Sequence, residues 1–349
     1  MYTYRLVLLG FGAVGQGFAR LLRDKADDLR VRYQFGAQIV GVYTRRASLF
    51  DPTGLDTSAL LHAAQGGGLS AYPGSPKLRR DLDAAAMIAH PEADTLILAT
   101  PTDLADPGPA VAQVKRAFQA GKNVITVNKA PIATAYPELS ALAKDAGLFF
   151  GYEGVVMGGT PAVRLAQEAL AGSRISEIRG VINGTTNYML SRMEAGASYA
   201  EALAEAQAKG YAETDPTADV EGYDAAGKLI ILIALLFGQT LRLDQMDCHG
   251  ITEIGPQAIA EASAAGERWK LIASARLTDG KVEASVKPIR LPLSDPLAGV
   301  EGIMNAVTYV TEEMGGVTLT GAGAGGVPTG FAVLSDLLAL HRKRLAGAG

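Results

Sequence analysis

The sequence predicts two domains: an α/β domain built on a doubly wound parallel sheet, and a second, α+β domain. Short β-branched and apolar runs alternate with helical patterns over the first 150 residues, which is typical of a parallel sheet covered by helices. The chain has 349 residues, more than a single hydrophobic core usually supports. Its composition changes at residues 151–161, where we place the domain boundary.

The elements of the first half follow in a regular order. Strands are expected at residues 4–9, 38–43, 95–99, 123–127 and 148–151. Helices are expected after Gly15 and at residues 110–120 and 136–145, the last ending before Gly147 in a left-handed C-terminal cap. Residues 44–80 are rich in Gly, Pro, Ser and Asp, which predicts a long connection with one short helix. The tail reads as a strand at residues 316–320, a glycine-rich loop at 321–326 and a helix at 329–344.

Composition and charge exclude several classes of partner. The formal net charge is −4 and no Lys/Arg block occurs, so we expect neither nucleic acid nor an acidic membrane as a partner. Cys248 is the only cysteine, which excludes an intrachain disulfide and favours a reducing, cytoplasmic compartment. The longest apolar run, residues 229–237, is shorter than the roughly 20 residues that cross a bilayer, so it predicts a buried helix.

A glycine motif follows the first predicted strand and opens a predicted helix. It consists of Gly10, Phe11, Gly12, Ala13, Val14 and Gly15. In this context the glycines permit a tight turn and let backbone N–H groups approach a pyrophosphate. A glycine turn without a ligand is the alternative.

The four histidines are dispersed without a zinc motif, and no hydrolase elbow or Walker sequence occurs, so hydride transfer is the chemistry that remains.

Two arginines follow the second predicted strand, where an NAD-specific site usually carries an acid. Arg45 and Arg46 stand there after Thr44, and no carboxylate is present. Planar guanidinium groups suit a ribose 2′-phosphate, so NADP(H) is favoured over NAD(H). The alternative is that both side chains belong to a solvated loop.

Three charged residues are candidates for the chemistry. Lys129 follows the fourth predicted strand, and ligands bind at the carboxyl ends of strands in open α/β sheets. Asp224 and Lys228 are four residues apart on a predicted helix, so they share one face. Most such pairs are exposed and weak. Here the lysine leads into the apolar run, so burial and the neighbouring acid act on it in opposite directions, and the pair is predicted to be a proton donor.

Together these residues resemble one family, the homoserine dehydrogenases, in a short form without an appended aspartokinase or regulatory domain. The resemblance covers nearly the whole chain and rests on motifs in a fixed order. They are residues 10–15, 128–131, 153–161 (Glu-Gly-Val-Val-Met-Gly-Gly-Thr-Pro), 183–188 (Asn-Gly-Thr-Thr-Asn-Tyr), 210–228 and 321–325. One departure is Gly154, which stands where an alanine is frequent.

The resemblance implies roles for individual residues. Asp224 and Lys228 correspond to the catalytic pair, with Lys129 of the nucleotide domain facing them across the cleft. The implied substrate-binding residues are Glu213, Asp219, Gly184, Thr185 and Tyr211, with Asp219 also supporting the lysine. The implied cofactor-binding residues add Thr100, Lys129 and Gly325 to the glycine motif and the two arginines. Backbone carbonyls of Glu153, Val156, Gly158 and Thr160 would hold a monovalent cation, Na⁺, at a structural site.

The resemblance also implies a domain plan and an activity. Residues 1–150, completed by 321–349, would bind the dinucleotide, and residues 151–320 would form a catalytic and dimerisation domain. The chain would interconvert L-aspartate 4-semialdehyde and L-homoserine, in threonine, methionine and isoleucine biosynthesis. A homodimer is expected, with residues 180–189 and 230–237 supplying its surface. The alternatives are a dehydrogenase of another amino acid, of aspartate or diaminodiacid type, and a catalytically silent NADP-binding scaffold.

Overall fold

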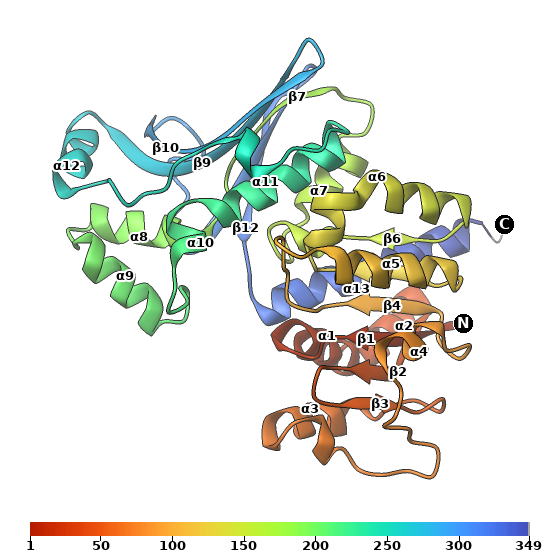
Figure 1. The fold of residues 1–349 in the computed structure, drawn as a ribbon. Helices are drawn as coiled ribbons and strands as arrows, with labels where there is room; N and C mark the ends of the chain where they lie inside the picture. Colours follow the sequence, from red (N-terminus) through yellow and green to blue (C-terminus); the bar gives the residue numbers. More distant parts are fainter. Residues whose placement is uncertain (348–349) are drawn as a thin grey trace. The chain divides into compact units, whose positions relative to one another are not determined.

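The computed structural model describes residues 1–347, which form two compact units. The first unit combines Met1–Gly159 with the segment that starts at Gly325, and the second unit is Thr160–Ala324. Figure 1 shows the elements of both in the colours of the chain. The division after residue 159 falls within the boundary predicted at residues 151–161, though beyond residue 150, and the division at 325 lies four residues beyond the predicted 321.

Local packing explains both differences. The helical turn η2 (Glu153–Val155) belongs to the first unit because it is bonded to the helix α13 (Gly326–Ala346) of that unit. The Glu153 N–H donates to the carboxylate of Asp336, a residue of α13, at 3.0 Å. A Cβ at Gly154 would lie 2.6 Å from a methyl group of Val127, so an alanine at this position would require the Val127 side chain to shift. At the other division, strand β12 (Gly315–Ala322) continues its pairing as far as Ala322 and keeps residues 321–324 of the glycine-rich loop in the second unit.

The first unit contains a six-stranded sheet in the order β3-β2-β1-β4-β5-β6. The strands are β1 (Tyr2–Leu9), β2 (Phe35–Tyr43), β3 (Ser48–Phe50), β4 (Thr95–Leu98), β5 (Asn123–Thr126) and β6 (Phe150–Gly151). All neighbours are parallel except the edge strand β3, which is antiparallel to β2. The predicted Rossmann-type sheet is confirmed.

Helices cover both faces of this sheet. They are α1 (Ala13–Asp24), α2 (Ala26–Tyr33), α3 (Thr57–Gly66), α4 (Ala84–Ala89), α5 (Gly108–Gln119), α6 (Ala130–Asp145) and α13, with the short turn η1 (Leu69–Ala71). Because side chains alternate along a strand, Leu6 and Leu8 of β1 pack with Phe18 of α1, whereas Val7 and Leu9 belong to the core under α4, α5 and α6. The predicted helix at 136–145 is the second part of α6: the backbone is non-helical at Ala135, and a first part begins at Ala130, where proline is tolerated in the first turn.

The connection after β2 is more ordered than the sequence predicts. It carries the strand β3 and the turn η1 besides the expected helix α3. Asp51 organises it: this buried carboxylate accepts hydrogen bonds from the Thr53 N–H at 2.8 Å and from the Ser75 hydroxyl at 2.7 Å. A buried acid with these donors gives the connection a defined structure, whereas its composition alone predicted an irregular one.

The second unit contains a mainly antiparallel sheet in the order β12-β11-β7-β9-β10-β8. Besides β12 its strands are β7 (Ile175–Val181), β8 (Asp247–Cys248), β9 (Glu267–Thr278), β10 (Lys281–Pro292) and β11 (Met304–Thr311). Its helices are α7 (Ala162–Arg164), η3 (Leu165–Ala169), α8 (Gly184–Glu194), α9 (Tyr199–Ala208), α10 (Thr217–Val220), α11 (Tyr223–Leu236), η4 (Leu243–Gln245) and α12 (Pro256–Ala264). Helices α8, α11 and α12 contact the central strand β9.

The apolar run that the sequence assigned to a buried helix is the body of α11. Every residue from Ala225 to Leu235 is buried, so the prediction is confirmed. The same burial makes the expected subunit surface wrong: residues 230–235 and nearly all of 180–189 pack inside the second unit. None of the helices described in residues 1–347 is both long and apolar enough to cross a membrane.

Candidate active site

The glycine motif forms the turn between β1 and α1. Gly10 has φ +97°, and a Cβ there would lie 2.3 Å from the carbonyl oxygen of Ala99. A Cβ at Gly15 would lie 2.8 Å from the Gly10 carbonyl oxygen, whereas a Cβ at Gly12 would meet no protein atom within 4 Å. Gly12 is the N-cap residue of α1, and no side chain caps this end. Two glycines therefore close the turn, and the third leaves open space at a helix N-terminus, which fits a dinucleotide pyrophosphate.

The ends of β4 and β5 meet beside this turn, because β4 is paired with both β1 and β5. Asn128 joins them: its amide donates to the Thr100 hydroxyl at 3.0 Å and to the Pro101 carbonyl at 3.0 Å. The next residue, Lys129, is half-buried, and its N–H donates to the Thr102 hydroxyl at 3.1 Å. Thr100 and Lys129 thus lie at the carboxyl edge of the sheet, as the sequence predicts for ligand-binding residues.

Three further predicted cofactor residues lie at the same edge. Arg45 and Arg46 form the exposed turn between β2 and β3, which is closed by the Thr44 N–H bonding to the Ala47 carbonyl at 2.8 Å. Neither guanidinium has an ion-pair partner among residues 1–347. Gly325 precedes α13, and a Cβ at Gly326 would lie 2.7 Å from the Ala13 carbonyl oxygen, so the start of α13 lies against the start of α1.

In the second unit, Asp224 and Lys228 are joined on α11. The lysine Nζ lies 2.7 Å from the Asp224 Oδ2 and donates to the backbone carbonyl of Ile182 at 2.7 Å. The side chains of Lys228 and Asp224 are 10% and 20% exposed. Residues 1–347 provide no third acceptor within bonding distance of Nζ. An ammonium has three N–H donors, so one remains for a ligand.

Asn183 holds the acids of this site together; it opens the 183–188 motif, but the sequence analysis gave it no role of its own. Its Nδ2 donates to Asp219 Oδ1 at 2.6 Å and to Asp224 Oδ2 at 3.0 Å. Asp219 was expected to support the lysine, but it reaches Lys228 only through Asn183 and Asp224. The Asn-Gly-Thr-Thr run carries an N-cap signal, and Asn183 does cap α8. That signal does not reveal the two carboxylates.

The other predicted substrate residues lie around the start of α8. The Thr185 hydroxyl donates to the Tyr211 carbonyl at 2.8 Å, and a Cβ at Gly184 would lie 2.8 Å from the Ile303 carbonyl oxygen. The Tyr211 ring packs edge-on against that of Tyr188. Glu213 is exposed, and no hydrogen bond or ion pair joins its carboxylate to the described residues. The structure thus brings Thr185 and Tyr211 together and leaves the Glu213 carboxylate available to a ligand.

The four residues of the expected cation site lie along one short stretch. Glu153 is in η2, and Val156 and Gly158 lie outside helices and strands. Between them Met157 has φ +56°, as has Gly158, so the backbone turns sharply. Thr160 opens the second unit.

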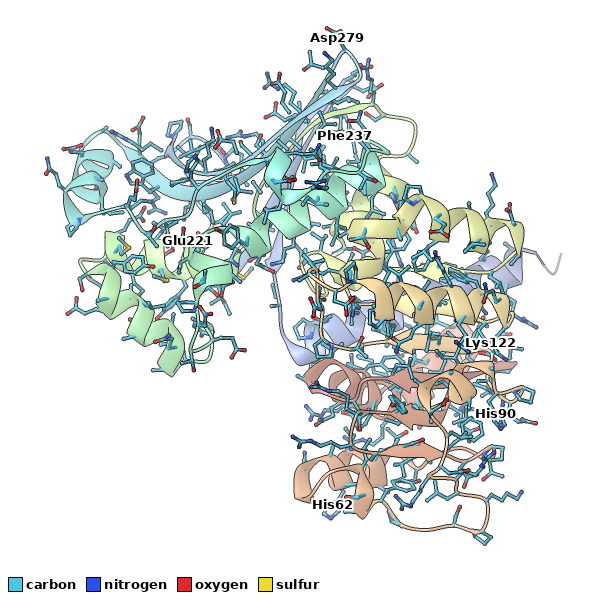
Figure 2. The ribbon with its side chains drawn as sticks, in the orientation of Figure 1. His62, His90, Lys122, Glu221, Phe237 and Asp279 are labelled. Carbon is cyan, nitrogen blue, oxygen red and sulfur yellow. The ribbon has the colours of Figure 1, made fainter. Side chains whose placement is uncertain are left out.

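Side-chain metal ligands do not cluster in the described chain. Within residues 1–347 no group of three or more His, Cys, Asp or Glu side chains is arranged to hold a metal ion. Figure 2 labels His62 and His90, which belong to separate parts of the first unit. His90 packs against the Phe50 ring at 4.0 Å between centroids, and burial lowers its pKa.

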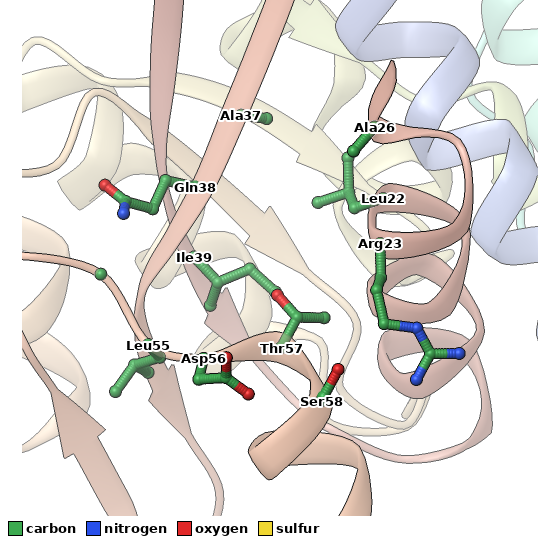
Figure 3. A pocket seen from close by; sticks show the side chains of 11 residues that line it. Leu22, Arg23, Ala26, Ala37, Gln38, Ile39, Leu55, Asp56, Thr57 and Ser58 are labelled. Atoms are coloured by element: carbon green, nitrogen blue, oxygen red, sulfur yellow. The ribbon is translucent and has the colours of Figure 1, made fainter. Parts of the chain in front are cut away.

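A pocket of about 510 Å³ lies elsewhere in the first unit. Figure 3 shows its lining, which includes Leu22 and Arg23 of α1, Gln38 of β2 and Asp56 before α3. None of the predicted cofactor or substrate residues lines it. It lies beside the first half of β2, whereas the glycine turn follows the end of β1, so it is not the candidate active site.

Comparisons with known proteins cover both units. Residues 161–338 match the model of the family described as homoserine dehydrogenase, and residues 10–153 match the model described as homoserine dehydrogenase, NAD binding domain. The chain is 41% identical over 346 residues to an NAD(+)-dependent homoserine dehydrogenase of Pseudomonas canavaninivorans, covering 98% of this chain and 97% of the relative.

Solved structures are similar over the same length. A homoserine dehydrogenase from Thiobacillus denitrificans has a TM-score of 0.84 at 33% identity, covering 99% of this chain and 75% of that chain. A hyperthermophilic archaeal homoserine dehydrogenase in complex with NADPH has a TM-score of 0.83 at 28% identity, covering 98% of both chains. With the glycine turn and the Asp224/Lys228 pair in place, these matches show that the chain belongs to the homoserine dehydrogenase family.

Proposed function

We propose that the chain interconverts L-aspartate 4-semialdehyde and L-homoserine with a nicotinamide cofactor. One observation carries the proposal: a buried ammonium, Lys228 Nζ, uses two of its N–H groups on Asp224 and Ile182 and keeps the third for a ligand. Reduction of an aldehyde requires such a donor, because negative charge develops on the carbonyl oxygen.

The bound nicotinamide supplies the hydride to the aldehyde carbon. Lys228 donates its remaining N–H to the carbonyl oxygen, stabilises the developing alkoxide and transfers a proton to it. Asp224 keeps the lysine oriented throughout through their 2.7 Å ion pair. Glu213 binds the substrate ammonium with its exposed carboxylate. Lys129 acts at the strand ends of the nucleotide-binding unit, where it adds a positive charge for the cofactor or substrate.

The cofactor preference is a separate proposal. Arg45 and Arg46 are exposed, lack ion-pair partners in the described chain and follow the end of β2, which supports binding of a 2′-phosphate and hence NADP(H). One relative is named as NAD(+)-dependent and one archaeal structure contains NADPH, so relatives of both kinds exist.

A structural Na⁺ site is proposed at the carbonyls of Glu153, Val156, Gly158 and Thr160. The sharp turn through Met157 and Gly158 supports it, since carbonyl groups outside regular pairing suit a hard cation. Replacing Na⁺ by tetramethylammonium, which is too large for such a site, lowers the melting temperature if a cation is held there.

The proposal also extends to the setting of the enzyme. We propose a homodimer in the cytoplasm that contributes to threonine, methionine and isoleucine biosynthesis. The single cysteine supports a reducing compartment. Light scattering of the purified chain measures the subunit number.

The deciding experiment adds homoserine to the protein with NADP⁺ or NAD⁺ and follows the absorbance band of the reduced nicotinamide. We expect the band to grow with both cofactors, faster with NADP⁺. Growth with aspartate or a diaminodiacid instead of homoserine would assign the chain to another amino-acid dehydrogenase. No growth with any of these substrates would leave a silent nucleotide-binding scaffold.

A further inference from the structure

Two successive residues at the end of β7 contact both members of the catalytic pair. The Ile182 carbonyl accepts a hydrogen bond from Lys228 Nζ at 2.7 Å. Asn183 donates to the Asp224 Oδ2 at 3.0 Å, the same oxygen that lies 2.7 Å from Nζ. These residues are 46 and 41 positions from Lys228 and Asp224 in the sequence, so a strand end adds contacts to a pair that the helix spacing brings together.

The orientation of the Asn183 amide is determined by its neighbours. Its Oδ1 accepts from the Thr186 N–H at 2.9 Å and from the Thr186 hydroxyl at 2.9 Å. The Nδ2 group therefore faces the two carboxylates, and both of its N–H donors are used, one on Asp219 and one on Asp224. Asn183 is 4% exposed, so water does not compete effectively for these bonds.

The arrangement has a consequence for Lys228. Asn183 links a second carboxylate, that of Asp219, to the Asp224 carboxylate that is paired with Lys228. If Asp219 took its hydrogen bond from Lys228, all three N–H groups of the ammonium would be occupied by protein acceptors. The neutral amide of Asn183 supplies that bond instead, at 2.6 Å to Asp219.

We propose that Asn183 is a positioning residue for the reaction: its amide holds Asp219 and Asp224 so that one N–H of Lys228 stays available to the substrate oxygen. This inference rests on the proposed function, since it concerns the proton donor of that reaction. It assigns to Asn183 a role beyond capping α8.

Substitutions can separate capping from positioning, because asparagine, aspartate and serine are about equally good N-cap residues. Asn183→Asp keeps the cap acceptor and the shape but replaces both donors by a third acceptor. Asn183→Ser keeps the cap and removes the donors. Ser198→Ala is the matched control, because Ser198 caps α9 of the same unit through a capping box and is exposed.

The measurements are kcat and KM for homoserine, and the melting temperature. We expect Asn183→Asp and Asn183→Ser to lower kcat by about 10- to 100-fold, the scale of one charge-assisted hydrogen bond, when kcat is measured on folded protein. The melting temperature should fall as well, because both variants deprive buried carboxylates of their donors. KM should change by less than about threefold, because substrate binding by Glu213 is untouched. Ser198→Ala should lower the melting temperature and leave kcat unchanged.

A pure capping role predicts the opposite result: full kcat in both Asn183 variants while Lys228→Met is inactive, which would overturn the inference and leave the proposed function intact. A crystal structure of Asn183→Ser provides a readout independent of turnover. We expect Asp219 to turn toward Lys228 and occupy the third N–H. Unchanged positions of Asp219, Asp224 and Lys228 in that structure would equally overturn the inference. If the unmodified chain does not oxidise homoserine, the proposed function fails, and the crystal structure still decides the positioning role.

Discussion

Replacement of Lys228 by methionine tests the proton donor directly. Methionine is close to lysine in length and stays apolar, so Lys228→Met removes the ammonium with little change in volume. The substitution removes the bonds to Asp224 Oδ2 and to the Ile182 carbonyl, each 2.7 Å long. It also removes the third N–H, which has no acceptor within residues 1–347.

The expected loss follows from that third donor. Removing one donor to a developing oxyanion costs about 10²- to 10³-fold in kcat, and removing a general acid costs about 10²- to 10⁴-fold. A single group that performs both roles should therefore account for roughly 10²- to 10⁴-fold, or about 3–5 kcal/mol of activation free energy. The affinity for NADPH should not change, because the glycine turn belongs to the other unit.

The variant should fold, though less stably. Asp224 loses the ammonium but keeps the Asn183 amide at 3.0 Å, and its side chain is 20% exposed. We therefore expect a loss of about 1–3 kcal/mol in the free energy of unfolding, the range for one unsatisfied buried group. Lys287→Met is the control: Lys287 is 39% exposed and paired with Asp247 on the surface of the same unit, so activity should not change.

The assay is steady-state oxidation of homoserine and reduction of the aldehyde, with NADPH binding measured by fluorescence titration. A folded Lys228→Met protein with kcat within about threefold of the unmodified chain would remove Lys228 from the reaction. A parallel loss of NADPH affinity would show that the damage is not local to α11.

Three further predictions concern other parts of the molecule. Gly12→Ala should weaken NADPH binding by roughly 10- to 100-fold and leave the melting temperature unchanged, because a Cβ there meets no protein atom within 4 Å. Gly10→Ala should destabilise the fold, because its Cβ would lie 2.3 Å from a carbonyl oxygen and φ is +97°. Equal effects of the two substitutions would contradict the assignment of Gly12 to the cofactor site. Replacing both Arg45 and Arg46 by alanine should raise the KM for NADP⁺ by about tenfold or more and leave the KM for NAD⁺ unchanged. Equal changes in the two KM values would refute the contact with the 2′-phosphate. Burial lowers the pKa of Lys270 to about 8 from its ordinary 10.5, so between these values the unfolded chain binds more protons and the unfolding free energy rises with pH. Between pH 7.5 and 10 the unmodified chain should gain about 2 kcal/mol relative to Lys270→Met in urea unfolding. Parallel pH dependences of the two proteins would refute a lowered pKa for Lys270.

Local patterns predicted the elements that carry the site. The run from Gly10 to Gly15 determines a turn because only glycine adopts φ +97° at Gly10 without strain. Asp224 and Lys228 share a face because they are four residues apart on a helix, and their ion pair is present at 2.7 Å. The connection after β2 was predicted less well, because its order depends on the buried carboxylate of Asp51, which takes a hydrogen bond from Ser75, 24 residues away.

The sequence by itself determined the glycine turn, the strand periodicity and the shared helix face, since these depend on residues within a few positions of one another. Tertiary structure decided which groups complete the pair. The Ile182 carbonyl and the Asn183 amide are 46 and 41 residues distant from their partners, and they reach α11 only because β7 is paired between β9 and β11 in the sheet beneath that helix. Strand order of this kind depends on the burial of whole faces, and no short run of residues encodes it.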